Sequence, residues 1–236
     1  MKLAIVIPTY NERTTLPPLI EVIMKEIRNI TEEIFIIIID DSSPDGTGEI
    51  AEQLNKKYDN ITVIHRKSKL GIGSAYKEGF KLALERFDPD FIIQMDSDYS
   101  HDPMEIPQMT QRMNEYDIAI ASRHVTGSSI IGWSFHRKMI HSLACALAGT
   151  CGHMKISDPT SGFRIFKKNV LNSVNFSEIS SEGFAFQIEL LHKLWKMGYK
   201  IIEVPTRFVN RKEGKSKMGF SEAIQYMKIC FCLLSK

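Results

Sequence analysis

The sequence of 236 residues has no long apolar run and little cysteine. No stretch approaches the roughly 20 apolar residues that a membrane-spanning helix needs. The apolar start at residues 3–7 is far too short for the core of a secretory signal. The four cysteines have no CxxC spacing, which argues against a disulfide framework and indicates reduced thiols. These absences predict a cytoplasmic protein that is attached to a membrane surface at most.

An excess of charge of one sign is also missing. Thirty Lys and Arg residues against 28 Asp and Glu give a net charge of +2, whereas a dedicated nucleic-acid binder usually has a dominant basic face. The seven histidines show neither HExxH nor paired-cysteine spacing, so we expect no zinc site. Neither a Gly/Ser-rich or Pro-rich linker nor an internal repeat divides the chain. We therefore expect a single domain over residues 1–236.

Short apolar runs alternate with segments of helical period along the front half. Runs dominated by Ile and Val predict strands at residues 3–7, 34–39, 61–64, 91–95 and 118–121. Amphipathic segments predict helices at residues 16–30, 47–58, 72–86 and 106–114. Because the strands lack in/out alternation, we expect helices to cover both of their faces. This order predicts an α/β fold with a mostly parallel sheet flanked by helices.

The pattern changes after residue 125. Helical segments are expected at residues 133–151, 186–197 and 221–234. Strands are expected at residues 162–166 and 201–209, the second interrupted by Pro205. The back half therefore continues the same domain and is expected to complete a second binding site.

Acid-bearing loops follow three of the predicted strands, at residues 8–12, 40–47 and 96–103. In open parallel sheets, ligands bind beyond the carboxyl ends of the strands. Asp96 and Asp98, at i and i+2 after a buried strand, can both reach Mg²⁺ or Mn²⁺ and leave positions open for phosphate oxygens. The alternative is a solvated Asp-rich turn. The two other loops at the same edge favour the metal.

Two further motifs in these loops are open to two interpretations. The adjacent charges of Asp40 and Asp41 need compensating donors, which a ligand base or ribose would supply. Residues 45–47 are expected to form a turn that caps the next helix in either case. Residues 71–73 (GIG) lack the spacing of a phosphate-binding loop and are expected to form a turn into a helix.

Taken together, the motifs resemble the family-two inverting glycosyltransferases of GT-A fold. The shared segments are residues 5–12 (IVIPTYNE), 40–47 (DDSSPDGT) and 95–98 (MDSD). Within that family the chain is similar to the branch of dolichol-phosphate (polyprenol) mannose synthases from residue 2 to about residue 230. That closer similarity rests on residues 71–76, 100–103, 121–123, 137–138, 157–164, 183–189, 208–211 and 214–217.

The resemblance implies GDP-mannose as donor, Mn²⁺ or Mg²⁺ as cofactor and a polyprenyl (dolichyl) phosphate lipid as acceptor. It divides the domain into a nucleotide-sugar-binding half (1–125) and an acceptor-binding half (126–236). The nucleotide contacts that it implies are Pro8, Tyr10, Glu12, Ile39 and Asp41. The metal and diphosphate contacts are Asp96, Ser97 and Asp98, with Ser100 at a position where some members use Gln as a further ligand. The phosphate-handling cations are Arg123, Arg211 and Lys217.

The expected chemistry needs cations more than a base. The acceptor is a phosphate monoester with a second pKa of ~6, so it is already an anion at neutral pH. Arg123 and Arg137 are the candidates that cradle it, because guanidinium binds phosphate bidentately. With Asp98 they form the predicted catalytic set. Glu182 is the nearest carboxylate if a base were needed, as in relatives that glycosylate hydroxyls. His141 stands where many relatives carry Ser, so the acceptor pocket around His141 is expected to differ from that of those relatives.

The apolar stripe of residues 133–151 and the apolar tail at residues 224–234 have two interpretations. They either pack on the core or lie in a membrane interface. For a lipid acceptor, an interfacial helix or a partner subunit is expected to hold the chain at the cytoplasmic face of a membrane. Two other functions stay open: a transferase that uses a UDP-sugar such as UDP-glucose, and a non-catalytic nucleotide-sugar-binding module. The intact acids at residues 96 and 98 weigh against the second.

Overall fold

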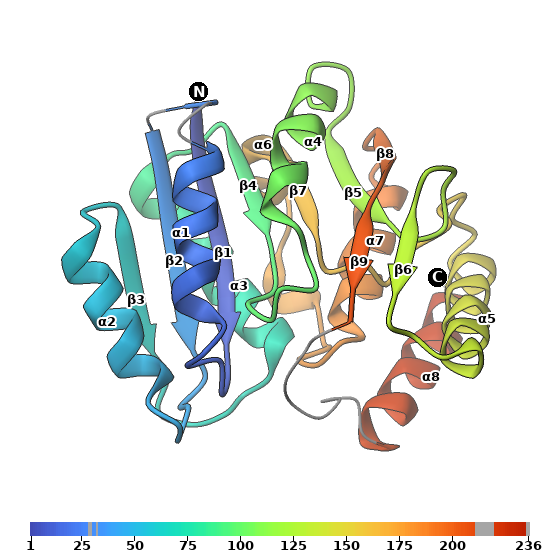
Figure 1. Cartoon of the computed structure of the whole chain (residues 1–236). Helices are drawn as coiled ribbons and strands as arrows, with labels where there is room; N and C mark the ends of the chain where they lie inside the picture. The colour runs from blue at the N-terminus through green and yellow to red at the C-terminus, as the bar shows by residue number, and fades with distance from the viewer. Residues whose placement is uncertain (28–29, 32, 211–219, 235–236) are drawn as a thin grey trace.

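The computed structural model describes residues 1–27, 30, 31, 33–210 and 220–234. Within these residues a seven-stranded sheet has the order β3-β2-β1-β4-β7-β5-β8 (Figure 1). Its strands are β1 (Lys2–Thr9), β2 (Glu33–Asp40), β3 (Ile61–His65), β4 (Phe91–Gln94), β5 (Ile118–Ser122), β7 (Arg164–Lys167) and β8 (Ile201–Pro205). All neighbouring strands are parallel except β7, which runs antiparallel to β4 and β5. The predicted mostly parallel sheet is confirmed.

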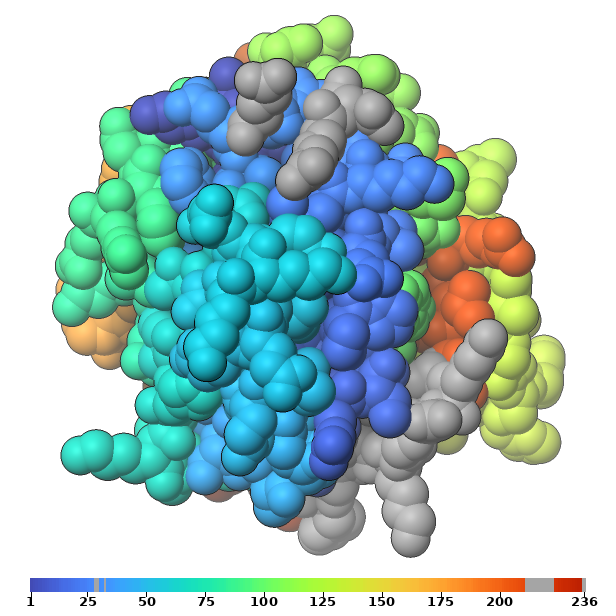
Figure 2. Space-filling model, turned by 60° about the vertical axis from the view of Figure 1, so that its left-hand side comes forward, coloured from blue at the N-terminus to red at the C-terminus, as the bar shows by residue number. Residues whose placement is uncertain are grey.

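Helices cover both faces of the sheet. The helices α1 (Leu16–Ile27), α2 (Thr47–Lys57) and α4 (Ile106–Arg112) contribute to the core on one face. Figure 2 shows α1 and α2 side by side at the surface. The helices α3 (Ile72–Leu82), α6 (Lys168–Asn172), α7 (Phe186–Lys196), α5 (Phe135–Cys151) and α8 (Phe220–Leu234) contribute to the core on the other face. Single turns lie at Ala83–Phe87 (π-helical), Pro103–Glu105 and Phe176–Glu178 (both 3-10).

The sequence of α1 explains why it forms and how it packs. Its buried side chains recur at the spacing of one helical face: Leu16, Leu19, Ile20, Ile23, Met24 and Ile27. Pro17 and Pro18 stand in the first turn, where a missing N–H costs nothing because that group has no partner within the helix. The neighbouring strand β1 is buried along almost its whole length, so its apolar side chains pack into the core on both faces of the sheet.

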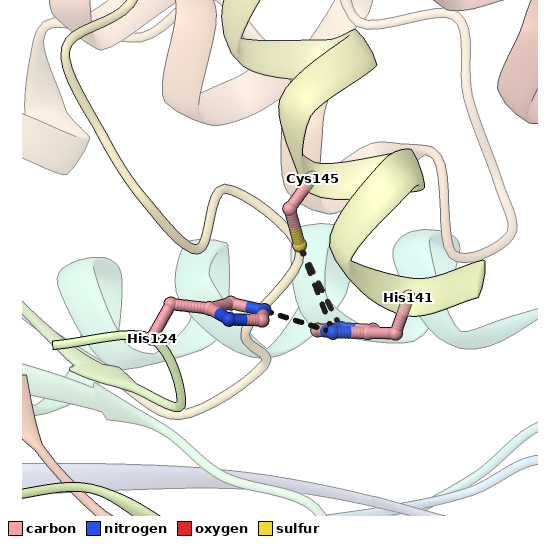
Figure 3. A group of neighbouring side chains, drawn as sticks. All are labelled: His124, His141 and Cys145. Carbon is pink, nitrogen blue, oxygen red and sulfur yellow. Dashed lines mark hydrogen bonds between the residues drawn. The ribbon is translucent and has the colours of Figure 1, made fainter. Parts of the chain in front are cut away.

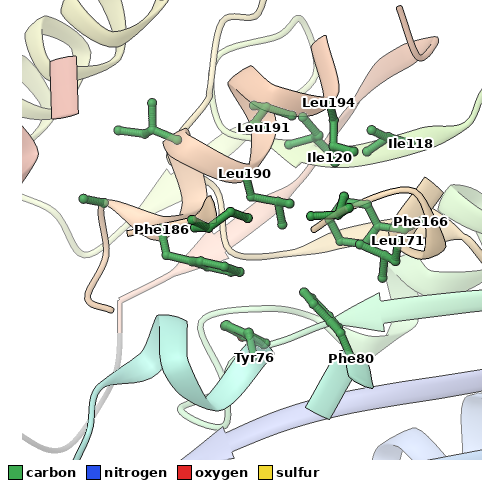
Figure 4. Close-up of a cluster of buried hydrophobic side chains, with 14 of the residues drawn as sticks. Tyr76, Phe80, Ile118, Ile120, Phe166, Leu171, Phe186, Leu190, Leu191 and Leu194 are labelled. Atoms are coloured by element: carbon green, nitrogen blue, oxygen red, sulfur yellow. The ribbon is translucent and has the colours of Figure 1, made fainter. Parts of the chain in front are cut away.

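The core on the opposite face is rich in aromatic side chains (Figure 4). Tyr76 and Phe80 of α3 stack on each other with ring centroids 5.7 Å apart. Tyr76 also stacks on Phe186 at the start of α7, at 6.3 Å. This packing fixes α3 against α7, and α3 carries the tyrosine that reaches the acidic loop after β4.

The predicted strand at residues 201–209 is in fact two strands. The first, β8, ends at Pro205, and β9 (Arg207–Val209) pairs in parallel with β6 (Ser129–Ile131) in a separate two-stranded sheet. Thr206 lies between them, where its N–H donates to the Ser122 carbonyl and its hydroxyl to Glu105. The predicted strand at residues 162–166 is observed as β7, shifted by up to two residues.

The helices α5 and α8 pack against each other beside the sheet (Figure 1). The Tyr226 hydroxyl of α8 donates to the Ala144 carbonyl of α5 at 2.5 Å. Large apolar side chains stay exposed on both helices: Phe135, Met139, Ile140 and Leu143 on α5, and Ile224, Met227, Phe231 and Leu234 on α8. Across the ranges that the structure describes, we find no helix with the length and apolar character needed to cross a bilayer.

Candidate functional site

The three acid-bearing loops lie side by side at the carboxyl ends of β1, β2 and β4. The Ser97 hydroxyl donates to the Pro8 carbonyl at 3.0 Å, which joins the loop after β4 to the carboxyl end of β1. The backbone N–H of Glu12 donates to the Thr47 hydroxyl at 2.9 Å, which joins the loop after β1 to the start of α2. The loops that the sequence analysis placed at one edge of the sheet are therefore hydrogen-bonded to one another.

Asp96 is held by two buried ring side chains. The Tyr76 hydroxyl donates to Oδ1 of Asp96 at 2.7 Å, and the backbone N–H of Asp96 donates to Nδ1 of His101 at 3.0 Å. Because Nδ1 accepts, neutral His101 carries its proton on Nε2, which lies 3.9 Å from Oδ2 of Asp96. Burial lowers the pKa of His101 and raises the pKa of Tyr76, so both groups are uncharged near pH 7.

The loop turns sharply after Asp96. Oδ1 of Asp98 accepts a hydrogen bond from the backbone N–H of Ser100 at 3.0 Å. Tyr99 between them has a left-handed φ of 62°. Asp98 and Ser100 are both buried, and the two aspartates belong to one short loop whose conformation is fixed by its own hydrogen bonds.

The donor set of this loop fits a hard divalent cation. Gly162 lies against Asp96, and a Cβ at that position would come within 3.3 Å of Oδ2 of Asp96. Glycine therefore leaves space in front of the carboxylate that a side chain would fill. Mg²⁺ and Mn²⁺ are commonly held by one or two carboxylates together with substrate oxygens. Asp96 and Asp98 are of the ligand type that this pattern needs, and ligation by Asp96, Asp98 and Ser100 stays a prediction.

The carboxylate of Asp41 is engaged by the loop after β3. Oδ1 accepts from Nη1 of Arg66 at 2.9 Å and from the backbone N–H of Leu70 at 2.9 Å, and Oδ2 accepts from the N–H of Gly71 at 3.0 Å. These bonds use three of the roughly four lone-pair positions of a carboxylate. Asp41 thus shapes the turn into α3, as predicted for residues 71–73, and little of it is left for a ligand.

The role expected for Ile39 does not hold in this structure. Ile39 lies on the face of β2 that α3 covers. Ile39 is fully buried, and a Cβ on Gly79 of α3 would come within 2.7 Å of its Cδ1. A nucleotide base therefore has no exposed Ile39 side chain to pack on.

Of the three nucleotide contacts predicted around the end of β1, only Tyr10 is partly exposed. Tyr10 is half-buried, and Nζ of Lys69 lies 3.7 Å from the centre of its ring. Glu12 is buried, and its Oε2 accepts from the Thr15 hydroxyl at 2.7 Å at the start of α1. Pro8 is buried beneath the loop. Contacts of these three residues with a nucleotide stay predictions.

Arg123 forms a buried bidentate ion pair that the sequence analysis missed. Its Nε lies 2.6 Å from Oδ2 of Asp158 and its Nη2 lies 2.8 Å from Oδ1, and Nη2 also donates to the Thr160 hydroxyl at 2.8 Å. Burial raises the pKa of Asp158, but the charge and hydrogen bonds of Arg123 outweigh it and hold that pKa below its ordinary range. Asp158 lies within residues 157–164, one of the segments on which the family resemblance rests. Membership of that segment was the signal in the sequence that could have pointed to Asp158.

A tryptophan lies between Arg123 and Arg137. The guanidinium carbon of Arg137 is 4.3 Å from the centre of the Trp133 ring, and that of Arg123 is 5.8 Å away. Nη1 of Arg137 also donates to Asn210 at 3.0 Å. Among the described residues nothing accepts a hydrogen bond from the buried indole N–H of Trp133. Two guanidinium groups and an unused donor make this region suited to an anion.

A cluster of two histidines and a cysteine borders the Arg123 ion pair (Figure 3). His124 follows β5, whereas His141 and Cys145 lie one turn apart on α5. Nε2 of His124 is 3.0 Å from Nδ1 of His141, and Sγ of Cys145 is 3.8 Å from the same nitrogen. Motif spacing did not reveal this cluster, because only the i, i+4 pair on α5 is local in the sequence.

Three further predicted residues have different outcomes. The Glu182 side chain is exposed, and its carbonyl accepts from the N–H of Gly73 at 2.7 Å, so the backbone of Glu182 supports the start of α3. Arg211 and Lys217 lie outside the described residues.

The chain is similar to known proteins over most of its length. The family model of "Glycosyl transferase family 2" matches residues 4–174. The undecaprenyl-phosphate mannosyltransferase of Micrococcus luteus is 34% identical over 93% of this chain and 88% of that protein. The polyprenol monophosphomannose synthase of Mycolicibacterium smegmatis is 35% identical over 94% of this chain and 83% of that protein.

Solved structures support the fold. Glucosyl-3-phosphoglycerate synthase from Mycobacterium tuberculosis, in complex with Mn²⁺, UDP-glucose and phosphoglyceric acid, superposes with a TM-score of 0.70 at 18% identity, covering 99% of this chain and 80% of that one. The same enzyme with Mg²⁺ and UDP gives a TM-score of 0.68 at 17% identity, covering 99% and 79%. With a family model matched over most of its length and two relatives above 30% identity, the chain belongs to glycosyl transferase family 2.

Proposed function

We propose that this glycosyltransferase moves mannose from GDP-mannose to a polyprenyl phosphate, by direct attack of the acceptor phosphate on the sugar. The observation that carries the proposal is the similarity over almost the whole chain to two relatives named for mannose transfer to undecaprenyl phosphate or polyprenol. The similarity includes the back half, where an acceptor is expected to bind. Family membership alone is compatible with other sugar donors.

The donor end of the proposed site is the loop that carries Asp96, Ser97 and Asp98. These aspartates would hold Mn²⁺ or Mg²⁺ against the nucleotide diphosphate, and the ion would neutralise the charge that develops on the leaving group. Tyr76 orients Asp96 through its 2.7 Å hydrogen bond. Tyr10 would contact the nucleotide from the loop after β1.

The acceptor end is the region around Trp133. Arg137 is half-buried and stacked on the indole ring, so it presents a charge that is already oriented. Arg123 contributes a second cation, although Asp158 balances much of its charge. The indole N–H of Trp133 supplies a donor that the described residues leave unused. A phosphate monoester is an anion at pH 7, so this set can bind it and activate it without a general base.

The lipid part of the acceptor accounts for the exposed apolar side chains on α5 and α8. Phe135 is 75% exposed, Leu143 65% and Phe231 63%, although large apolar residues usually lie inside a soluble domain. We propose that this pair of helices rests in the headgroup region of a membrane, which would bring Arg137 near the phosphate of the lipid.

The direct test is a transfer assay. GDP-[¹⁴C]mannose, Mn²⁺ and polyprenyl phosphate in vesicles are expected to yield a charged, organic-soluble mannolipid. Asp98→Asn should lower the rate by about 10²–10³-fold, because it removes a charge that stabilises the transition state. The matched control is Asp88→Asn, an exposed aspartate with a left-handed φ of 47° that Asn also adopts readily. Unchanged transfer in Asp98→Asn contradicts the proposed donor site.

A UDP-sugar donor is the second candidate. It is favoured by the fold similarity to an enzyme crystallised with UDP-glucose. Titration of GDP and UDP in the presence of Mn²⁺ separates the two candidates, since tight UDP binding without GDP binding would replace GDP-mannose as donor. Absence of transfer from either donor, with nucleotide binding retained, would favour a non-catalytic module.

A further inference from the structure

We propose that His124, His141 and Cys145 form a second metal site, for a zinc-class transition-metal ion, separate from the carboxylates after β4. The three donor atoms, one from each residue, lie within 4.8 Å of one another. They come from two elements, the segment after β5 and one face of α5 (Figure 3). Nothing in the proposed transfer reaction requires this set.

The distances between the donor atoms are close to those of a tetrahedral zinc site. Zn–N bonds of about 2.0–2.1 Å and Zn–S bonds of about 2.3 Å place ligand atoms roughly 3.3–3.6 Å apart at tetrahedral angles. The observed separations are 3.0 Å between Nε2 of His124 and Nδ1 of His141, and 3.8 Å between that Nδ1 and Sγ of Cys145. Small side-chain rotations would bring both separations into that range.

The proton positions around His141 suit a metal ligand. The Thr160 hydroxyl donates to Oδ1 of Asp158 at 2.8 Å, so its oxygen can accept from Nε2 of His141 at 3.0 Å. His141 then carries its proton on Nε2 and directs the lone pair of Nδ1 toward His124. Sγ of Cys145 lies 3.8 Å from Nδ1 and 3.7 Å from Nε2 of His141, so binding requires a side-chain rotation that brings Sγ to the Nδ1 side of the ring. A histidine that ligates a metal usually donates its other ring N–H to an oxygen, and here Thr160 supplies that oxygen.

An ion can reach the cluster from outside. A cavity of about 400 Å³ opens beside it, lined by His124 and Cys145 and by parts of α5 and of residues 154–157. Binding requires that the Cys145 thiol release its proton to solvent and that the ring proton of His124 move to Nδ1. Burial raises the pKa of Cys145 to about 12, so the ion must displace this proton and its affinity should increase with pH.

The ligand types separate this site from the carboxylate site. Imidazole and thiolate select Zn²⁺ and Co²⁺ over Mg²⁺ and Mn²⁺, which favour oxygen donors. One cobalt titration can therefore report on the two sites independently. Co²⁺ bound to a thiolate gives a ligand-to-metal charge-transfer band in the near ultraviolet, whereas Co²⁺ on carboxylates gives none.

The test is an anaerobic titration of the full reduced chain with Co²⁺, followed by absorption. We expect one Co²⁺ per chain with a charge-transfer band, displaced by Zn²⁺ but not by excess Mg²⁺. Cys145→Ser should abolish the band, and His141→Asn should weaken Co²⁺ binding by about tenfold or more. His136→Ala, an exposed histidine on the same helix, is the matched control and should keep the band.

The remaining outcomes are also decisive. His124→Asn replaces a residue outside the helices and provides the same test if a change in α5 disturbs folding, which circular dichroism monitors. Asp98→Asn should keep the cobalt band whether or not it loses transfer, so failure of the proposed function leaves this result untouched. No band in the unmodified chain, or a band that survives in Cys145→Ser, overturns the proposal.

Discussion

The buried ion pair between Arg123 and Asp158 is expected to be costly to break. The side chain of Asp158 is fully buried and that of Arg123 is 10% exposed. Arg123→Met would leave a carboxylate inside the protein with only the Arg123 backbone N–H, Thr160 and the weak Cys145 donor for compensation. Breaking a buried pair by removing one partner costs about 3–5 kcal/mol. Exposed Arg112→Met, the matched control, should change the stability by less than about 0.5 kcal/mol.

The assay is thermal unfolding at pH 7, followed by circular dichroism. In a chain of this size about 1 kcal/mol shifts Tm by roughly 2–4 °C, so Arg123→Met should lower Tm by roughly 6–20 °C. Adding Asp158→Asn to Arg123→Met removes the unpaired charge, so the double variant should lose less stability than the two single losses added together. Equal Tm values for Arg123→Met and Arg112→Met, or strictly additive losses, would refute this reasoning.

The same pair predicts a pH dependence with a defined sign. The folded-state pKa of Asp158 lies below its ordinary value of 3.8, so its ion pair stabilises the fold above that pH. As the pH falls below 3.8 and approaches the folded-state pKa, this contribution is lost. In Arg123→Met, burial without the guanidinium raises the pKa of Asp158, so its carboxyl becomes protonated at a higher pH than in the unmodified chain. The stability difference between the unmodified chain and Arg123→Met should therefore be largest at neutral or higher pH and should shrink as the pH falls, beginning above pH 3.8.

Three further predictions concern other parts of the chain. Tyr76→Phe keeps the aromatic packing but removes the hydrogen bond to Asp96, so the Mn²⁺ concentration needed for half-maximal transfer should rise by about 10–100-fold, as measured by metal titration. Iodoacetamide at pH 8 should modify exposed Cys232 well before Cys145, whose burial raises its pKa to about 12, and peptide mass spectrometry checks the order. Burial raises the pKa of Glu189, but hydrogen bonds from two neighbouring serines outweigh it and lower that pKa. Urea unfolding of Glu189→Gln should therefore show a loss of stability at pH 7 that shrinks as the pH falls below 4.5.

The sequence predicted the parts of the fold that depend on local pattern. Parallel strands buried on both faces give apolar runs, and α1 gives a clear helical period, so these elements were found with small errors at their ends. The strand direction of β7 and its place in the sheet, between β4 and β5, were not predicted. Four residues, Arg164–Lys167, carry no local signal that this strand enters between β4 and β5 and runs the other way.

Sequence alone can point to a candidate site where one loop carries all of the proposed ligands, as with Asp96 and Asp98. It could not do so where contacts join distant segments. Arg123 and Asp158 are 35 residues apart, and Asp41 meets Arg66 only because the loop after β3 folds back over β2. The burial of Ile39 could not be predicted from the sequence, because alternation along a strand says which residues share a face, but not which helix covers that face.

The reversed direction of β7 has a consequence for the proposed reaction site. An antiparallel strand begins at the edge where its parallel neighbours end, so the peptide that leads into β7 crosses that edge. Along this peptide, Asp158 forms the ion pair with Arg123, and Gly162 lies against Asp96. Buried Arg164 holds the peptide in place by donating to the Pro159 carbonyl at 2.8 Å. Residues 158–162 therefore link the proposed donor end and the proposed acceptor end of the site through the backbone. Lengthening this segment by one residue would change their separation even if every side chain were kept.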